Sequence, residues 1–136
     1  MASFVLTNAF VLLNSVGLSD HVRSVKVTYK ADTPENTAMS QTTKNRLPGL
    51  KDWEMDIEFN QDFAAAEVDV TLFPLVGAAA FPIEVRPDAG ARSTTNPAYT
   101  GNCLLADYPP LGNKVGEVAV SSIKLMGSGT LSRLTA

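Results

Sequence analysis

The segment from residue 51 to residue 60 constrains the fold of this chain more than any other. Large apolar residues alternate there with acidic residues, and successive side chains of a β-strand point to opposite faces. The apolar set is Trp53, Met55, Ile57 and Phe59, and the acidic set is Glu54, Asp56 and Glu58. The alternation therefore predicts a half-buried antiparallel strand with its apolar face in a core.

The three acidic side chains of this strand would form a row with about 7 Å between neighbours, from a rise of about 3.4 Å per residue. One interpretation is a polar outer face that keeps the sheet soluble. Another is the wall of an aqueous channel for a polyanion, because like charge keeps such a cargo from sticking. Paired carboxylates can also act as general acid and base, but a row on one solvent face is more typical of a solvated surface. We therefore expect no enzymatic activity.

The rest of the chain also favours strands. Residues 22–30 alternate, so that one face of a strand would carry Val25, Val27 and Tyr29 and the other Ser24, Lys26 and Thr28. Further strands are expected at 4–14, 81–86, 99–108, 115–126 and 130–134. No internal repeat or linker separates these segments, so we expect a mainly β, antiparallel fold in a single domain over residues 1–136.

One helix is expected between residues 63 and 72. The alanines at 64–66 favour a helix, Asp62 is a suitable N-cap, and Pro74 would end the helix. The alternation of residues 68–72 favours a strand instead, but a helical face is also present. That face would carry Phe63, Ala66, Val70 and Phe73.

Residues 31–49 form a long polar segment between two predicted strands. The segment is rich in Thr, Asn and Ser and has little periodicity. Loops of this length inside a compact domain are uncommon and are usually functional or disordered. Two interpretations stay open: an arm that becomes ordered against a neighbouring subunit, or a surface excursion without a partner.

Composition excludes several kinds of function. The net charge is −3 and the pI is near 5.0, which argues against a protein that binds nucleic acid by neutralising phosphates. The single cysteine, Cys103, lies in an apolar run and is expected to be a buried hydrophobic residue without a disulfide. His21 is the single histidine and is expected in a turn far from Cys103, so we expect no metal site, cofactor or catalytic thiol. No signal peptide or membrane-inserting segment is expected.

The order of several short motifs resembles the major tail tube proteins of long-tailed, non-contractile bacteriophages. The resemblance covers nearly the whole chain. Its motifs are the runs at 47–53, 57–63, 73–77, 83–88, 93–101, 108–112 and 115–117, which include Leu-Pro-Gly-Leu-Lys-Asp-Trp at the start and Tyr-Pro-Pro-Leu-Gly near the end.

The resemblance implies both a fold and an assembly. The fold would be an antiparallel β-sandwich or half-barrel flanked by one α-helix. Six subunits would form a ring with a continuous β-barrel, and the rings would stack into a tube through which the viral genome leaves. Its partners would be other copies of the chain, the tape-measure protein, the tail terminator and tail tip proteins, and DNA that passes without specific binding. Its location would be the virion tail, after assembly in the bacterial cytoplasm.

The resemblance also assigns candidate residues. By position, the segment 31–49 matches the loop that reaches the adjacent ring, and its candidate contact residues are Thr37, Met39, Gln41, Lys44 and Arg46. The candidate lumen-lining residues are Glu54, Asp56 and Glu58, or the facing Ser24, Lys26 and Thr28. In either case Trp53, Met55, Ile57 and Phe59 would lie in the core.

Other functions remain open at this point. A tail terminator, a head–tail joining protein or a capsid decoration protein would have similar size and strand content. A β-barrel that binds a small ligand would contain an apolar cavity, and a hydrolase would depend on the acidic row.

Overall fold

The computed structural model describes residues 3–65 and 67–136, which form eight strands, one α-helix and two 3-10 helices. In chain order, the elements are β1 (Phe10–Leu13), β2 (Val16–Gly17), η1 (Ser19–His21), β3 (Val22–Ala31), β4 (Lys51–Asn60), α1 (Val68–Leu72), η2 (Phe73–Leu75), β5 (Phe81–Arg86), β6 (Ala98–Leu105), β7 (Val120–Gly127) and β8 (Ser132–Leu134).

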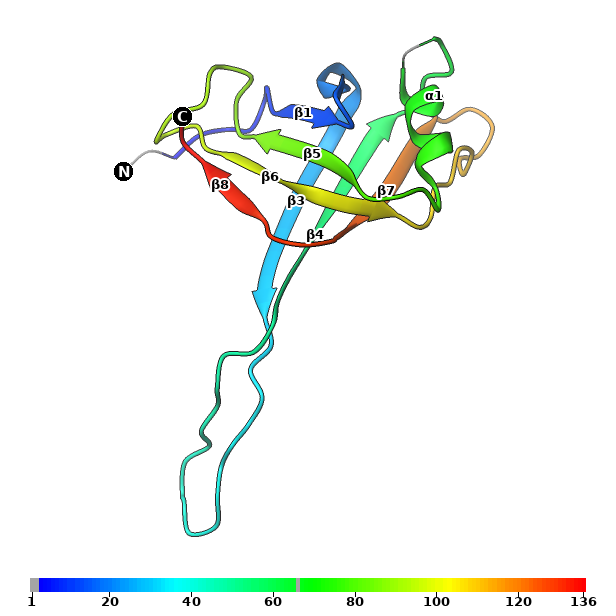
Figure 1. Ribbon diagram of the computed structural model, residues 1–136. Helices are drawn as coiled ribbons and strands as arrows, with labels where there is room; N and C mark the ends of the chain where they lie inside the picture. Colours follow the sequence, from blue (N-terminus) through cyan, green and yellow to red (C-terminus); the bar gives the residue numbers. More distant parts are fainter. Residues whose placement is uncertain (1–2, 66) are drawn as a thin grey trace.

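The eight strands form one antiparallel sheet. Its order is β2-β1-β5-β6-β7-β4-β3, and β8 pairs with β6 beside this path. The sheet folds over itself, so that β1, β5, β6 and β8 cross in front of β3 and β4 in Figure 1. The predicted class, a mainly β half-barrel with a flanking helix, is confirmed.

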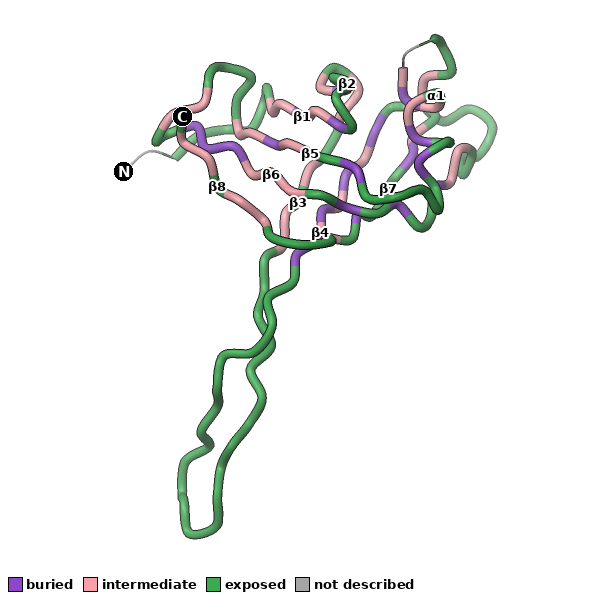
Figure 2. The backbone as a smooth tube through the Cα atoms, viewed as in Figure 1, coloured by how far each residue is buried: buried purple, intermediate pink, exposed green. Residues whose placement is uncertain are grey.

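The core lies between the two crossing layers. Strand β4 contributes its whole apolar face, since Trp53, Met55, Ile57 and Phe59 are buried. The opposite layer contributes Val11 and Leu13 of β1, Ile83 of β5 and Leu105 of β6, among others. Figure 2 shows the buried residues concentrated in this body.

Two glycines make room for Trp53 at the centre of the core. A Cβ atom on Gly127 would lie 2.4 Å from Cε2 of the indole, and a Cβ on Gly101 would lie 2.6 Å from Cζ2. Real Cβ atoms do not approach this closely, so both positions favour glycine for its missing side chain. The indole N–H donates to the carbonyl of Gly129 at 3.1 Å, which satisfies its one polar atom.

The helix is shorter than predicted. Helix α1 has five residues and begins at Val68, where Val68 and Leu72 pack into the core. Asp62 does not cap the helix, because its carboxylate accepts from the N–H of Ala64 and forms a local turn.

The predicted helical face is also wrong. Phe63, Val70 and Phe73 are exposed, and Ala66 lies outside the described residues. The chain turns before α1, so residues 63–65 follow a different path from the helix. None of the described helices is long and apolar enough to cross a membrane.

Two predicted strands start several residues later than expected, and the strand predicted at 130–134 begins two residues late, at Ser132. The first begins at Phe10 rather than near residue 4, because Phe10 pairs with Arg86 and Pro87 follows. Proline has no N–H, so the ladder does not continue beyond it. The strand predicted at 115–126 begins at Val120, whose N–H donates to the side chain of Asn113.

Residues 32–50 leave the body as a long narrow extension between β3 and β4 (Figure 1). The two arms of the extension are joined by backbone hydrogen bonds, from Asp32 to Leu50 (2.8 Å), Leu47 to Pro34 (2.9 Å) and Asn36 to Asn45 (2.9 Å). Its residues are all exposed (Figure 2). The segment is therefore an irregular hairpin that projects from the body.

Candidate assembly surfaces

The polar face of β3, β4 and β7 brings the candidate lumen residues into register. Ser24 pairs with Glu58, Lys26 with Asp56 and Thr28 with Glu54. On the other side of β4, the same three acids pair with Ser122, Lys124 and Met126. Six candidate residues thus form three rows across two strands, and β7 extends each row.

The acidic row is paired with basic side chains. Lys124 Nζ lies 3.4 Å from Glu54 Oε2, and Arg23 Nη1 lies 3.5 Å from Glu58 Oε1. Asp56 lies between Lys26 and Lys124 in the sheet register. Strand pairing therefore places basic side chains of β3 and β7 beside the acidic row. The three acids and the three bases named here (Arg23, Lys26 and Lys124) carry no net charge together.

Among residues 3–65 and 67–136, no strand pairs with one long edge of the sheet. Strand β3 has ten residues and pairs with β4 on one side only. Its other edge presents backbone N–H and C=O groups that a strand of another chain can pair with. The other end of the path, β2, has only two residues. The sheet is therefore open, with one edge suited to strand addition.

An apolar groove of about 460 Å³ runs beside this open edge. The inner face of β3 forms one wall with Val25, Val27 and Tyr29, and Val85, Tyr99 and Leu131 contribute to the opposite wall. Tyr29 is 52% exposed, although it belongs to the apolar face of its strand. Closure of the half-barrel by another chain would bury this groove.

The extension holds all five candidate contact residues. Thr37, Met39 and Gln41 lie at or near its tip, where a turn includes Ser40 with a positive φ of 68°. Lys44 and Arg46 lie on the returning arm, and the backbone of Arg46 forms an isolated antiparallel β-bridge with the backbone of Glu35. Met39 is 96% exposed, which leaves an apolar side chain in solvent at the end of the hairpin.

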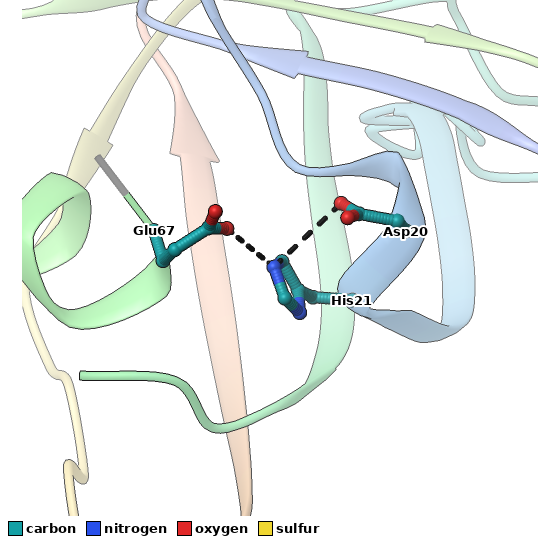
Figure 3. A group of neighbouring side chains, drawn as sticks. All are labelled: Asp20, His21 and Glu67. Carbon is teal, nitrogen blue, oxygen red and sulfur yellow. Dashed lines mark hydrogen bonds and ion pairs between the residues drawn. The ribbon is translucent and has the colours of Figure 1, made fainter. Parts of the chain in front are cut away.

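A cluster of titratable groups lies at the opposite end of β3 and β4. His21 Nε2 is 2.5 Å from Glu67 Oε2, 3.6 Å from Asp20 Oδ1 and 3.7 Å from Asp62 Oδ2. Figure 3 shows the imidazole between Asp20 of η1 and Glu67, which precedes α1. The His21 side chain is 16% exposed, so three carboxylates surround a partly buried ring.

The two most strongly perturbed titratable groups are structural. Burial raises the pKa of the Cys103 thiol to about 12, and its sulfur contacts the carbonyl oxygen of Phe81. Burial also raises the pKa of Tyr108 to about 12, and its hydroxyl donates to Asp69 while Gln61 donates to it. Neither geometry supplies an activated nucleophile.

The His21 cluster was missed in the sequence. Asp20 and His21 are adjacent, but Asp62 and Glu67 join them only because β3 and β4 are antiparallel neighbours. Their spacing matches no local metal or catalytic motif, so no local signal was available.

No protein-family model matches this chain, and no curated protein matches it at a significant level. Solved structures do match. A chain from the virion of a native gene transfer agent particle has a TM-score of 0.71 and 15% sequence identity, over 96% of this chain and 98% of that chain.

Two further structures show the same fold. A chain from the sheath/tube terminator of an extracellular contractile injection system in its extended state has a TM-score of 0.71 at 13% identity, over 98% of this chain and 97% of that one. A chain from the tail of an empty gene transfer agent particle, with C6 symmetry, has a TM-score of 0.62 at 16% identity, over 85% and 83%. The fold of this chain is therefore one found in tails and contractile injection systems.

Proposed function

We propose that this chain is a structural subunit of a phage-tail-like tube, in which six copies form a ring and the rings stack. The observation that carries the proposal is that one chain has both an open ten-residue sheet edge and a projecting hairpin. The open edge suits closure of a ring by a neighbouring copy, and the hairpin suits contact with the next ring. The C6 symmetry in the name of one similar structure supports the same number of subunits.

Within this ring, the polar face of β3, β4 and β7 lines the channel. The apolar side of the same strands packs into the core, so the polar side is the one left for water. On this face the acids of β4 are offset by bases of β3 and β7, so six copies add little net charge to the wall. A wall whose charges are paired would let DNA pass without binding.

The proposed location is the virion tail, with the tape-measure protein, terminator and tip proteins as partners. The resemblance to tube proteins of long-tailed, non-contractile phages belongs to this proposal. The chain would act by assembly rather than catalysis, since Cys103 is buried and Glu54 and Glu58 of β4 form ion pairs with bases.

Negative-stain electron microscopy of the purified, concentrated chain tests the proposal. Hollow tubes or stacked six-fold rings are expected. A protein that stays monomeric at high concentration, even with tape-measure protein added, would contradict it.

Deletion of residues 37–44 separates stacking from folding. The hairpin projects from the body, so the deletion variant should unfold at the temperature of the full chain. It should form rings that do not stack. Tubes of normal length from this variant would remove the hairpin from the proposed mechanism.

The second candidate is a tail terminator, which one similar structure favours because its name includes a sheath/tube terminator. A terminator would form a single ring that caps a tube. Rings of the full chain that never stack, but bind the end of a preformed tube, would support this alternative.

A further inference from the structure

The His21 cluster has a composition that a hydrogen bond alone does not explain. Three carboxylates, from Asp20, Asp62 and Glu67, converge on one ring nitrogen at 2.5 to 3.7 Å. Even with a charged imidazole, the group would carry a net charge of −2. No lysine or arginine forms an ion pair with these three acids among residues 3–65 and 67–136. The cluster therefore has an excess of negative charge around a nitrogen donor.

The donor atoms are close enough to share one ion. One ligand atom from each of Asp20, His21 and Glu67 lies within 4.8 Å of the other two. Asp62 lies beside this group of three but is not one of its members: its Oδ1 accepts from the N–H of Ala64 at 2.9 Å, and its Oδ2 faces His21 at 3.7 Å. The carboxylate is thus held by the chain with one oxygen turned toward the ring.

The donor types select a class of ion. One imidazole nitrogen with carboxylate oxygens suits first-row divalent transition ions, whereas Ca²⁺ and Mg²⁺ prefer sites made only of oxygen. At a four-coordinate Zn²⁺, bonds of about 2.0–2.2 Å hold neighbouring ligand atoms more than 3 Å apart. Glu67 would then retreat from His21 by less than about 1 Å, which a glutamate side chain can do by a small rotation.

We propose that Asp20, His21 and Glu67 form a binding site for a divalent transition ion such as Zn²⁺, with Asp62 as a nearby carboxylate that adds negative charge. The ion takes the place of the proton between His21 and Glu67. The site joins η1, which holds Asp20 and His21, to Glu67, the residue before α1 (Figure 3). It lies at the start of β3 and the end of β4, whereas the extension leaves from the other ends of these strands, so a bound ion stiffens the end of the body away from the hairpin.

This site does not depend on the proposed assembly. A monomer would bind the ion as well as a ring would, because all three donors come from one chain. The experiment therefore uses the full chain after dialysis against EDTA, at a concentration where it is monomeric.

Titration calorimetry with ZnCl₂ and thermal unfolding with and without ZnCl₂ test the site together. We expect one ion per chain and a rise in Tm of several degrees at saturating Zn²⁺, because an ion that binds only the folded state stabilises it. His21→Gln and Glu67→Gln should each weaken Zn²⁺ binding at least tenfold. Glu35→Gln, which removes an exposed carboxylate from the extension, is the matched control and should bind as the full chain does.

The folding of His21→Gln and Glu67→Gln is checked by their Tm without metal, so that lost binding is not confused with unfolding. Three outcomes would overturn the proposal. Absence of Zn²⁺ binding by the folded chain would refute the site. Zn²⁺ binding that both substitutions leave unchanged would assign the ion to other residues. A rise in Tm with CaCl₂ that equals the rise with ZnCl₂ would refute the role of the imidazole.

Discussion

Replacement of Gly127 by alanine should destabilise the protein, although alanine is a better strand residue than glycine. The new Cβ would lie 2.4 Å from Cε2 and 2.5 Å from Nε1 of Trp53. The indole cannot retreat freely, since Gly101 touches its far edge and the Gly129 carbonyl holds its N–H. Overpacking of this kind costs about 1–3 kcal/mol.

The net change in the free energy of unfolding is the difference between two opposing terms. The overpacking cost should be near the upper end of its range, about 3 kcal/mol, because the Trp53 side chain that the new Cβ meets is only 1% exposed. The gain from replacing a strand glycine is about 0.5–1 kcal/mol. The free energy of unfolding should therefore fall by about 2 kcal/mol, which corresponds to a Tm lower by about 8 °C in a chain of this size.

Thermal and urea unfolding of matched variants measure this effect. Gly17→Ala is the control, because Gly17 also lies in a strand and its Cβ would meet nothing within 4 Å. In a Trp53→Leu background, Gly127→Ala should cost at least 1 kcal/mol less, as expected for residues in direct contact. Equal stability of Gly127→Ala and Gly17→Ala would refute the close approach, and so would an equal cost in both backgrounds.

Three further predictions concern single side chains. Asn96→Ala should lower the free energy of unfolding by about 1–3 kcal/mol, because its amide donates to three backbone carbonyls of its loop; urea unfolding measures this, and an unchanged midpoint would contradict it. Tyr108→Phe should cost about 1–2 kcal/mol through loss of the hydrogen bond to Asp69, and thermal unfolding that matches the parent chain would refute this. Cys103 should react with a thiol reagent only as fast as the protein unfolds, and rapid labelling of the native chain would contradict its burial. Since its pKa rises from the usual 9.0 to about 12 on folding, its contribution to stability should be complete below pH 9 and decrease as the pH rises from 9 to 12.

The strands of the fold could be predicted because their signal is local. The alternation at 51–60 depends only on the period of a strand and on the burial of one face. The strand predicted at 81–86 has the same bounds in the structure, since alternation precedes Pro87 there. Lys26 lies opposite Asp56 in the sheet, so the two predicted sets of polar residues on these strands are direct neighbours.

The helix could not be placed as well, because its signals compete. Asp62 can cap a helix or form a local turn, and only the packing of Val68 and Leu72 decides in favour of the turn. The first residues of some strands could not be predicted either, because they depend on where the partner strand begins or ends. Phe10 begins its strand where β5 ends, and the sequence near residue 4 contains no sign of this.

The candidate surfaces were predicted in part. The polar face followed from alternation, but its neutralisation needed β7, whose Lys124 lies far along the chain from Glu54. A long polar loop at 31–49 was predicted from its length and composition, but the hydrogen bonds that make it a hairpin were not. The His21 cluster depends entirely on pairs of residues that the fold brings together, and no spacing in the sequence reports them.

The charges of β3 affect which partners its free edge can accept. The strand carries Arg23, Lys26 and Lys30 and no acidic residue. Two copies that paired antiparallel through this edge would bring six cations and no acid together, with Arg23 opposite Lys30 in one register, and like charges across a strand pair are destabilising. A two-fold dimer through β3 is therefore disfavoured, while a neighbour that offers a different edge meets no such repulsion. The composition of one strand thus favours head-to-tail contacts, which close into rings, over symmetric pairs that would end assembly at two copies.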